Sequence, residues 1–550
     1  MNTTNISIQD ISEKTFSFLK QTTVLDDLMA KAIPCNRGID GYAVPFCDLH
    51  KQNDALVEFV NNKLSQKIVG NLDYSALENL GPNQQAFLLQ DKVANTLGVV
   101  IVGAGIVEKK DTALIKALSI TERAKIENVK DIMRALLDWI SENLVSEKIV
   151  VDGSIEAKDL ISGIGFEFKN DQAIFQEDTS QLGKKDILTA GPTISSFENS
   201  YVLKASRYGW NSEWATYIKA FENKFSEYIG VQHALSTSSC TGALHIALKA
   251  LGIGPGDEVI VPEITWVATA SVIKYVGATP VFAEVEEGNW CLDPQKLEKA
   301  ITSKTKCIIP VHTYGHPCEM DKIMEIANKH GLFVVEDAAP AIGAECKGKR
   351  VGSFGHFAAF SFQGAKMLVT GEGGMLVCND KALYDKAYRI WDHGRTPGTF
   401  WINEVGFKYK MSNVQAALGL GQIERCEQQI KAKRRIANWY YEELKDFEGV
   451  KLWRESDWAR SIYWMSSLLI NPDWNVSRED FFAELKKYKI DTRPTFPAIS
   501  QYPMWEAPPK PVAKMIGDYG VNLPSGVKLK KSEVKFVAAK IKEILGKLKK

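Results

Sequence analysis

The sequence lacks an excess of charge of either sign. Its 550 residues contain 67 Lys and Arg against 67 Asp and Glu, so the formal net charge is zero. A protein that binds nucleic acid or an anionic membrane through bulk charge carries a basic surplus, so we expect neither kind of partner. Ligands must then be recognised by local arrangements of side chains.

Long apolar runs and closely spaced cysteines are also missing. The most apolar stretch, residues 258–282, is interrupted by Glu263 and Lys274, so it predicts strands and a helix instead of a membrane span of about 20 apolar residues. The opening MNTTNISIQDISEK has no signal-peptide pattern. The nine cysteines include no CxxC pair, which favours reduced thiols in a cytoplasmic protein.

The first part of the chain, residues 1–175, matches no family pattern, and we expect a mainly helical domain of unknown function there. Residues 126–144 carry apolar positions three and four apart, which predicts an amphipathic helix. The glycines of VVIVGAGIVEKK, residues 99–110, resemble a dinucleotide loop, but Glu108 replaces the third glycine and argues against it. The possible metal ligands in this part are Cys35, Cys47 and His50. A fourth ligand is missing, so we expect no metal site.

The composition changes in residues 176–192, which are polar and rich in turn-forming residues, and we interpret them as a linker. Beyond it, short apolar runs alternate with helix-length segments, which predicts an α/β domain with a mostly parallel sheet over residues 193–430. Residues 412–445 predict one long helix, and residues 431–550 a smaller C-terminal domain of strands and helices.

Two stretches offer binding groups. Residues 238–252, SSCTGALHIALKALG, predict a helix start whose free N–H groups and hydroxyls could bind a phosphate, although an ordinary Ser/Thr cap explains this stretch alone. Residues 330–341, HGLFVVEDAAPA, end an apolar strand at Asp337. A carboxylate there can hold a protonated ring nitrogen, or it can simply cap a helix.

A third stretch, residues 357–377 (FAAFSFQGAKMLVTGEGGMLV), places Lys366 between two apolar runs. A buried lysine loses hydration unless it is paired, neutral or covalently used. Burial lowers the pKa of an amine, which suits it to form a Schiff base; a lysine that reaches to solvent is the alternative. A phosphate site, a carboxylate and an amine are together what pyridoxal 5'-phosphate (PLP) requires.

With these residues the sequence resembles the DegT/StrS family of sugar aminotransferases over about residues 190–545. The resemblance implies a PLP-dependent transferase of fold type I, with a large mostly parallel domain and a small α+β domain. The matching text includes SSCTGALHIALKALGIGPGDEVIVPEITWVATA, PVHTYGHPCEM, VVEDAAPAIGAECKGKRVGSFG, SFQGAKMLVTGEGGMLV, GFKYKMSNVQAALGLGQIE, TRPTFP and NLPSGVKL.

The resemblance also implies a role for each matching position. Lys366 would bind the cofactor aldehyde and move the proton, with Asp337 holding the pyridine nitrogen, and Trp266 would lie against the cofactor ring. Related enzymes are dimers with shared sites, so Lys408 would approach the phosphate bound by the partner subunit. The family's phosphate positions are occupied by Cys240, Thr241 and Ser361.

The sequence departs from the family pattern at Cys240 (usually Gly), Pro340 (commonly Gln or His) and Lys408 (commonly Asn). The Cys240 N–H can still donate and Lys408 still offers a donor, so phosphate binding survives. Pro340 offers no polar side chain near the cofactor, and the sequence does not show which residue supplies one instead. Family members that act as dehydratases have His in place of the lysine, so Lys366 favours transamination.

The resemblance implies glutamate as amino donor and a keto sugar as acceptor, in amino-sugar or lipopolysaccharide biosynthesis. The sequence motifs favour a resemblance to perosamine-synthase-like enzymes, which use a nucleotide-linked 4-keto-6-deoxy sugar as acceptor. An 8-keto-3-deoxy-octulosonate (Kdo) sugar is the second choice of acceptor. The rival to an enzyme is a non-catalytic regulatory or binding protein on the same scaffold. Candidate sugar-side residues are Tyr314, His316, His393, Arg395 and Arg493.

Overall fold

The fold is taken from a computed structural model, which describes residues 182–194, 196–505 and 507–550 and eight earlier strands. The chain divides into two compact units. The first comprises residues 1–180 and 193–204, and the second comprises residues 181–192 and 205–550. Helix α8, Ser196–Tyr208, contains one boundary between them.

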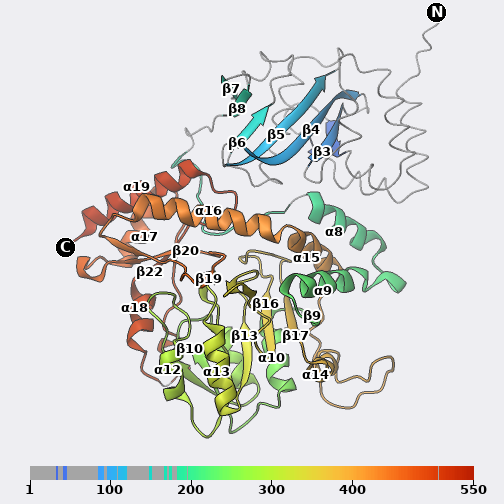
Figure 1. The fold of residues 1–550 in the computed structure, drawn as a ribbon, viewed down its shortest axis with the longest axis vertical. Coiled ribbons are helices and arrows are strands. Elements are labelled where there is room, and N and C mark those ends of the chain that lie inside the picture. The colour runs from blue at the N-terminus through green and yellow to red at the C-terminus, as the bar shows by residue number, and fades with distance from the viewer. Residues whose placement is uncertain are drawn as a thin grey trace, which may run out of the picture. The chain divides into compact units, whose positions relative to one another are not determined.

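The described residues of 1–175 all lie in one eight-stranded sheet, ordered β1-β2-β3-β4-β5-β6-β8-β7 and antiparallel except between β5 and β6 (Figure 1). These residues are strands, and the other residues of the part predicted to be mainly helical lie outside those that the structure describes. The predicted helix 126–144 and the cysteines and histidine considered for a metal lie outside the described residues. The strands are β1 Ile33–Pro34, β2 Gly41–Pro45, β3 Gln84–Asp91, β4 Thr96–Val107, β5 Lys110–Ile120, β6 Lys148–Val151, β7 Phe166–Lys169 and β8 Gln172–Phe175.

Strand β4 also explains the glycine-rich stretch within residues 99–110. Its glycines lie inside the strand, paired antiparallel with β5 from Gly98 opposite Ile120 to Val107 opposite Lys110. A dinucleotide loop joins a strand to a helix, and this stretch instead continues a hairpin. Runs of β-branched residues such as VVIV favour a strand that pairs with a neighbouring strand.

The second unit is built on a seven-stranded sheet of order β11-β10-β12-β13-β16-β17-β9. Every strand is parallel except β17, which is antiparallel to both of its neighbours. Apolar runs without alternation formed these strands, as expected for a sheet that is covered on both faces. The strands are β9 His233–Thr237, β10 Glu258–Pro262, β11 Thr279–Ala283, β12 Thr305–Ile308, β13 Phe333–Asp337, β16 Phe357–Ser361 and β17 Gly374–Cys378.

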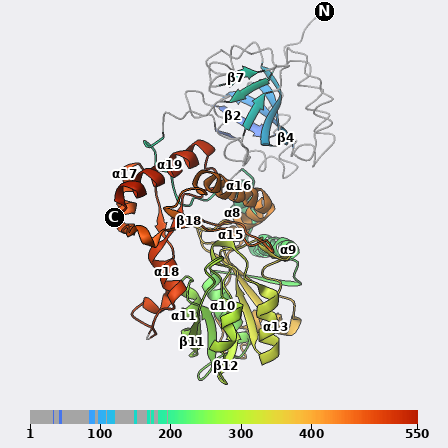
Figure 2. The ribbon, with the colours of Figure 1, turned by 60° about the vertical axis from the view of Figure 1, so that its left-hand side comes forward.

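Helices cover both faces of this sheet (Figures 1 and 2). Successive residues of a strand point to opposite faces, so Val259 and Val261 join one core with α10, α11 and α14, while Ile260 joins another with α13. On that second side α9 packs its phenylalanines against Phe360 and Phe362. The helices are α9 Thr216–Ile229, α10 Cys240–Ala250, α11 Ala268–Tyr275, α12 Pro294–Leu297, α13 Met320–His330 and α14 Lys381–Trp391.

The predicted long helix 412–445 is two helices, α15 Asn413–Glu424 and α16 Cys426–Leu444. The break falls at Arg425, whose φ of −104° and ψ of 8° leave the helical region. α15 packs closely on α9, since a Cβ on Gly419 would sit 2.6 Å from the Phe221 ring. The chain must change direction before α16 can join the small domain.

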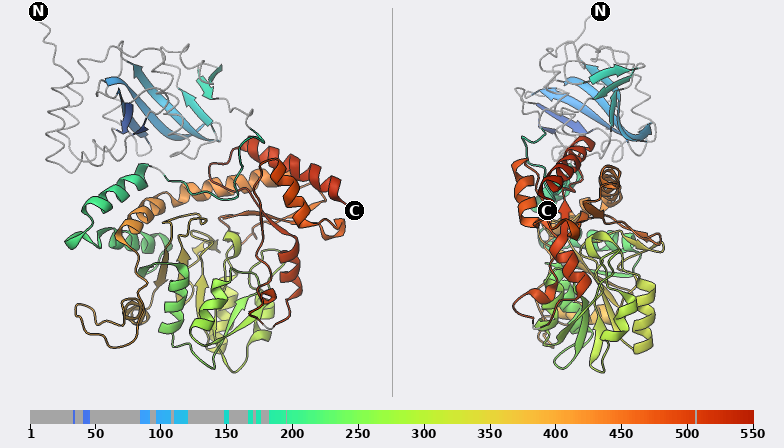
Figure 3. Two further views of the ribbon diagram at one scale, coloured as in Figure 1. Left: turned by 180° about the vertical axis from the view of Figure 1, so that it is seen from behind. Right: turned by 90° about the vertical axis from the view of Figure 1, so that its left-hand side faces the viewer.

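The small domain is an antiparallel sheet of order β18-β20-β22-β21, covered by α16, α17 and α19. Helices α16 and α19 lie side by side, orange and red in Figure 3. A three-stranded sheet, β15-β14-β19, links this domain to the large one. The bounds are β14 Glu345–Cys346, β15 Lys349–Arg350, β18 Val450–Leu452, β19 Ala459–Arg460, β20 Ser466–Ile470, β21 Arg493–Pro494, β22 Gly520–Leu523, α17 Arg478–Lys487, α18 Pro511–Tyr519 and α19 Lys531–Leu548.

Candidate active site

Polar residues gather at the carboxyl ends of the parallel strands. β13 ends at Asp337, which pairs with Ala359 of β16 two residues before Ser361. Ser361 in turn lies opposite Gly374 of β17, and Gly374 lies opposite Thr237 at the end of β9. The sheet therefore brings Asp337, Ser361 and the start of α10 to one edge, where open parallel sheets bind ligands.

Asp337 is a buried carboxylate with a fixed orientation. Its Oδ2 accepts a hydrogen bond from the Thr269 hydroxyl at 2.7 Å, and its Oδ1 accepts one from the Ala339 N–H at 3.1 Å. Burial raises the pKa of Asp337, and these two donors together with the charge of Lys366 oppose the rise. Pro340 is buried in the turn that follows, and the side-chain donor to this carboxylate is Thr269.

Lys366 lies in the loop between β16 and β17. Backbone bonds close this loop at both ends: Phe362 N–H donates to Gly373 O at 3.0 Å and Thr370 N–H to Phe362 O at 2.8 Å. Burial lowers the pKa of the Lys366 amine, while the charge of Asp337 opposes the fall. Its Nζ is 4.0 Å from the ring centroid of Trp464, a residue that sequence reasoning missed.

The start of α10 has the form of an anion cradle. The Ser239 hydroxyl accepts from the Gly242 N–H at 3.0 Å, and helical bonding begins with Ala243 N–H donating to Ser239 O. The N–H groups of Cys240 and Thr241 therefore have no partner inside the helix. A Cβ on Gly374 would lie 2.6 Å from Cys240 N, so only glycine lets β17 approach this turn and bring Ser361 beside it.

Trp266 follows β10 and is 58% exposed, with its ring 5.9 Å from that of Phe496. Its carbonyl accepts from the Thr269 N–H at 3.2 Å, which ties it to the residue that holds Asp337. Thr269 was also missed by sequence reasoning. The sequence feature that could have indicated Thr269 is its position shortly after Trp266.

Of the residues expected on the sugar side, Tyr314 and His316 are buried and fully engaged. The Tyr314 hydroxyl accepts from the Phe496 N–H at 2.8 Å, and its ring stacks on that of Trp464 at 5.9 Å. His316 uses both ring nitrogens: Nε2 accepts from Ser456 N–H at 3.0 Å, and Nδ1 donates to Pro317 O at 2.7 Å. Tyr314 thus lies beside the lysine site, whereas His316 is a core residue in this structure.

The remaining candidates occupy the surface. His393 is exposed in a turn with φ of 63°, and Arg395 pairs with Asp392, which also binds Lys410 at 2.7 Å. Arg493 is exposed and lies 3.4 Å from Asp491. Lys408 is exposed and bridges to Asp392 through the backbone. None of these contacts joins them to Lys366 or Asp337 within one subunit.

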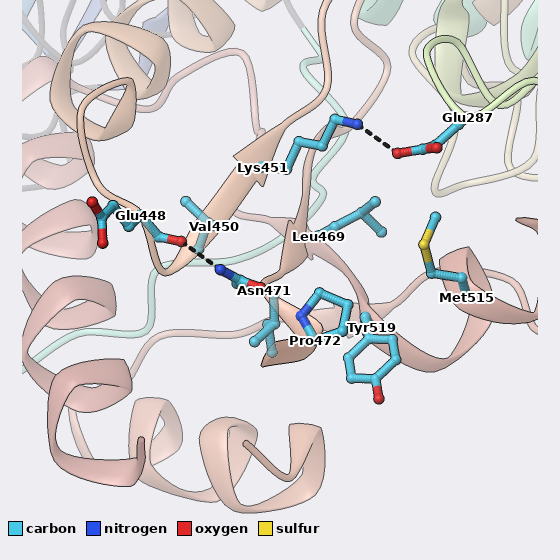
Figure 4. A pocket seen from close by; sticks show the side chains of 10 residues that line it. Glu287, Glu448, Val450, Lys451, Leu469, Asn471, Pro472, Met515 and Tyr519 are labelled. Carbon is cyan, nitrogen blue, oxygen red and sulfur yellow. Dashed lines mark hydrogen bonds and ion pairs between the residues drawn. The ribbon is translucent and has the colours of Figure 1, made fainter. Parts of the chain in front are cut away.

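A cavity of about 230 Å³ lies elsewhere, between the small domain and the loop that carries Glu287 (Figure 4). Lys451 crosses it to bind Glu287 at 2.6 Å, and Asn471 donates to Glu448 O at 3.0 Å. It contains no predicted site residue, so its size alone assigns it no function. Its lining is Glu287, Glu448, Val450, Lys451, Leu469, Ile470, Asn471, Pro472, Met515 and Tyr519.

Two other kinds of site are absent from the residues that the structure describes. In the described part of the chain, no three His, Cys, Asp or Glu side chains gather closely enough to hold a metal ion. The helices among those same residues include none that is both long and apolar enough to cross a membrane.

The residues present fit PLP. The free N–H groups and hydroxyls at α10 suit its phosphate, the buried Asp337 carboxylate suits a protonated ring nitrogen, and the desolvated Lys366 amine suits its aldehyde. The glycine contact at α10 shows that this cradle depends on a close backbone approach.

Comparison with known proteins supports the same conclusion. The profile of the DegT/DnrJ/EryC1/StrS aminotransferase family matches residues 192–542. A GDP-perosamine synthase of Escherichia coli is 41% identical over 355 residues, which are 64% of this chain and 96% of that protein. The GDP-perosamine synthase of Caulobacter vibrioides is 39% identical over 369 residues, 65% of this chain and 98% of that protein.

A solved structure shares the fold. The PLP-form of Spr1654 from Streptococcus pneumoniae, described as a sugar aminotransferase, superposes with a TM-score of 0.62 at 27% identity and covers 66% of this chain and 100% of that one. These matches confirm the family and the cofactor that the motifs indicated. The chain belongs to the DegT/DnrJ/EryC1/StrS family of PLP-dependent sugar aminotransferases.

Proposed function

We propose that this aminotransferase moves an amino group from glutamate to a nucleotide-linked 4-keto-6-deoxy sugar, for surface-polysaccharide or lipopolysaccharide biosynthesis. The observation that carries the chemistry is the buried Asp337 carboxylate at the end of β13, whose charge acts on the half-buried Lys366 amine. The sugar class rests on the relatives named GDP-perosamine synthases, at 41% and 39% identity.

The proposed roles follow from chemistry. Bound PLP supplies an electron sink that lets a proton leave the carbon bearing the amino group. Lys366 would hold the cofactor through its Nζ, and the same amine would serve as the base and acid that moves this proton. Asp337 would hold the protonated pyridine nitrogen of the cofactor, because the donors Thr269 and Ala339 favour its ionised form. Trp266 is proposed to lie against the cofactor ring, and the phosphate to bind Cys240, Thr241 and Ser361.

The acceptor is identified by product analysis. The PLP-loaded protein is incubated with glutamate and GDP-, dTDP- and UDP-linked 4-keto-6-deoxy sugars, or with an 8-keto octulosonate, and products are read by mass spectrometry. We expect amino-sugar product and 2-oxoglutarate from a nucleotide-linked sugar only. Turnover of the octulosonate alone would reject the proposed acceptor and keep the transaminase chemistry, whereas turnover of none would favour the non-catalytic alternative.

We also propose a homodimer with shared sites. The loop that follows α14 exposes apolar side chains, with Phe400 96%, Trp401 72% and Val405 90% exposed. Soluble monomers rarely leave such a cluster uncovered. A second copy of the chain covering it would bring the adjacent Lys408, which is exposed, toward the partner's phosphate site.

Mixing two inactive variants tests the shared site. If Lys408 serves the neighbouring subunit, Lys366→Ala and Lys408→Ala proteins mixed under subunit exchange should regain part of the activity, because one site of each mixed dimer is then intact. The replacement of both Phe400 and Val405 by Ser should shift the dimer toward monomer in sedimentation analysis. Subunit exchange without recovered activity would contradict the placement of Lys408.

The domain boundaries remain a proposal: 1–175, a linker at 176–192, 193–430 and 431–550. Part of this linker packs on the second unit, because Ile187 N–H donates to Lys489 O at 2.8 Å and the Thr189 hydroxyl to Asp491 at 2.7 Å. A fragment that begins at residue 181 should therefore fold and bind PLP. A soluble fragment from residue 193 with the same thermal stability would show that these contacts contribute nothing.

A further inference from the structure

We propose that Trp464 is the positioning residue for the Lys366 amine: its ring face holds the ammonium group, and its indole N–H fixes the peptide that precedes the lysine. The proposal deepens the function above and rests on Lys366 being the cofactor-binding lysine. Trp464 belongs to the small domain, just before β20, whereas Lys366 belongs to the large domain. The contact therefore links the two domains at the reacting atom.

Two contacts join Trp464 to consecutive residues of the lysine loop. The Lys366 Nζ lies 4.0 Å from the ring centroid, well inside the range of a cation–π interaction. The indole Nε1–H donates to the Ala365 carbonyl at 2.9 Å. One contact acts on the amine and the other on the backbone that carries it, so a single side chain restricts both.

The Trp464 ring is itself held in place. It is 6% exposed and stacks on Tyr314 with an interplanar angle of 19°, and Tyr314 stacks on Phe496 at the same angle. Its carbonyl accepts from Lys433 Nζ at 2.9 Å. Its backbone nitrogen lies 2.8 Å from where a Cβ on Gly315 would be, so the glycine permits this approach. A ring fixed by packing is preorganised to orient a functional group.

The charges around the amine explain why such a ring is useful. The charge of Asp337 favours the charged form of Lys366, against the burial that lowers its pKa. The ring face adds a further attraction for the ammonium without a second buried carboxylate. The ring thus gives the amine a defined place, instead of leaving it to turn toward solvent.

The test measures the Lys366 amine directly in protein freed of PLP. The pH dependence of its acetylation, followed by peptide mass spectrometry, gives its pKa in the wild type and in Trp464→Phe and Trp464→Leu. We expect the pKa to fall by roughly one pH unit in the Leu variant and by less in the Phe variant, because Phe binds cations more weakly than Trp. Trp453→Phe is the matched control, since Trp453 is equally buried and its ring contacts are Trp290, His316 and Tyr463.

A second readout isolates the indole N–H. Trp464→Phe keeps a ring but loses the bond to Ala365, so hydrogen exchange of the amides in residues 363–370 should rise roughly fivefold over the Trp453→Phe control. If Trp464→Leu does not fold, the Phe variant still decides through both measurements. Equal Lys366 pKa values and equal exchange in the Trp464 and Trp453 variants would overturn the proposal.

These outcomes are separable from failure of the proposed function. Borohydride reduction of the PLP-loaded wild type shows independently whether Lys366 binds the cofactor. A shifted amine pKa with an unlabelled Lys366 would mean that Trp464 holds this amine but that the amine is not the cofactor lysine, which rejects the role proposed here.

Discussion

Lys433 gives a quantitative prediction about the small domain. It is 5% exposed on α16, and its Nζ donates to Trp464 O at 2.9 Å and to Ser525 O at 2.6 Å, with no carboxylate among these partners. Burial lowers its pKa from the usual 10.5 to about 7. The folded protein therefore releases this proton several pH units before the unfolded chain does.

The sign of the pH dependence follows from proton linkage. Between the folded and unfolded pKa values the unfolded chain binds more protons, so stability rises with pH, and the destabilisation is largest at and below the folded pKa. From pH 7 to pH 9 the free energy of unfolding should gain about 2 kcal/mol from this one group. For a unit of this size that corresponds to about 3 °C in Tm.

The perturbation is Lys433→Met, which keeps the length of the side chain and removes the titrating amine. Thermal unfolding of the full chain is followed by tryptophan fluorescence from pH 7 to pH 9 for the wild type, the variant and Lys431→Met, an exposed lysine on the same helix. The absolute stability of the variant is not the readout, because two carbonyls also lose a donor. What matters is that the wild type and the control gain stability relative to Lys433→Met as pH rises. Parallel profiles for all three proteins would refute the reasoning.

Further predictions concern the cofactor site. Gly374→Ala should weaken PLP binding about 10- to 100-fold in an equilibrium titration, because its Cβ would displace the start of α10, and Gly364→Ala, whose nearest neighbour would be 3.8 Å away, should not. Equal affinities would contradict the cradle. Thr269→Val should raise the pKa of Asp337 by removing a donor to its charged form, and so move the acid limb of the kcat/KM profile up by about one pH unit. An unmoved limb would show that this hydroxyl does not tune the carboxylate.

The parts of the site that the sequence predicted are those encoded in one continuous stretch. Asp337 ends an apolar strand and Lys366 lies between two apolar runs, so the local sequence marked both positions as candidates. The start of α10 was visible for the same reason, as Ser and Thr before an apolar helix. Local patterns such as these survive folding because each element keeps its own period.

The parts that were missed depend on contacts between distant segments. Trp464 belongs to the small domain, so its contact with Lys366 forms only when the chain is folded. No local sequence pattern distinguishes this buried Trp from the other buried ones. His316 stands in a matching motif, yet both of its nitrogens are used by the backbone, which only a structure reveals.

The central claim is tested most directly by the site of covalent attachment. PLP-loaded protein is reduced with borohydride, digested and mapped by mass spectrometry, with Lys366→Ala treated in parallel. The account predicts one cofactor-modified lysine, Lys366, and no modified peptide in the variant. A modification on another lysine, or a labelled variant with normal turnover, would contradict it.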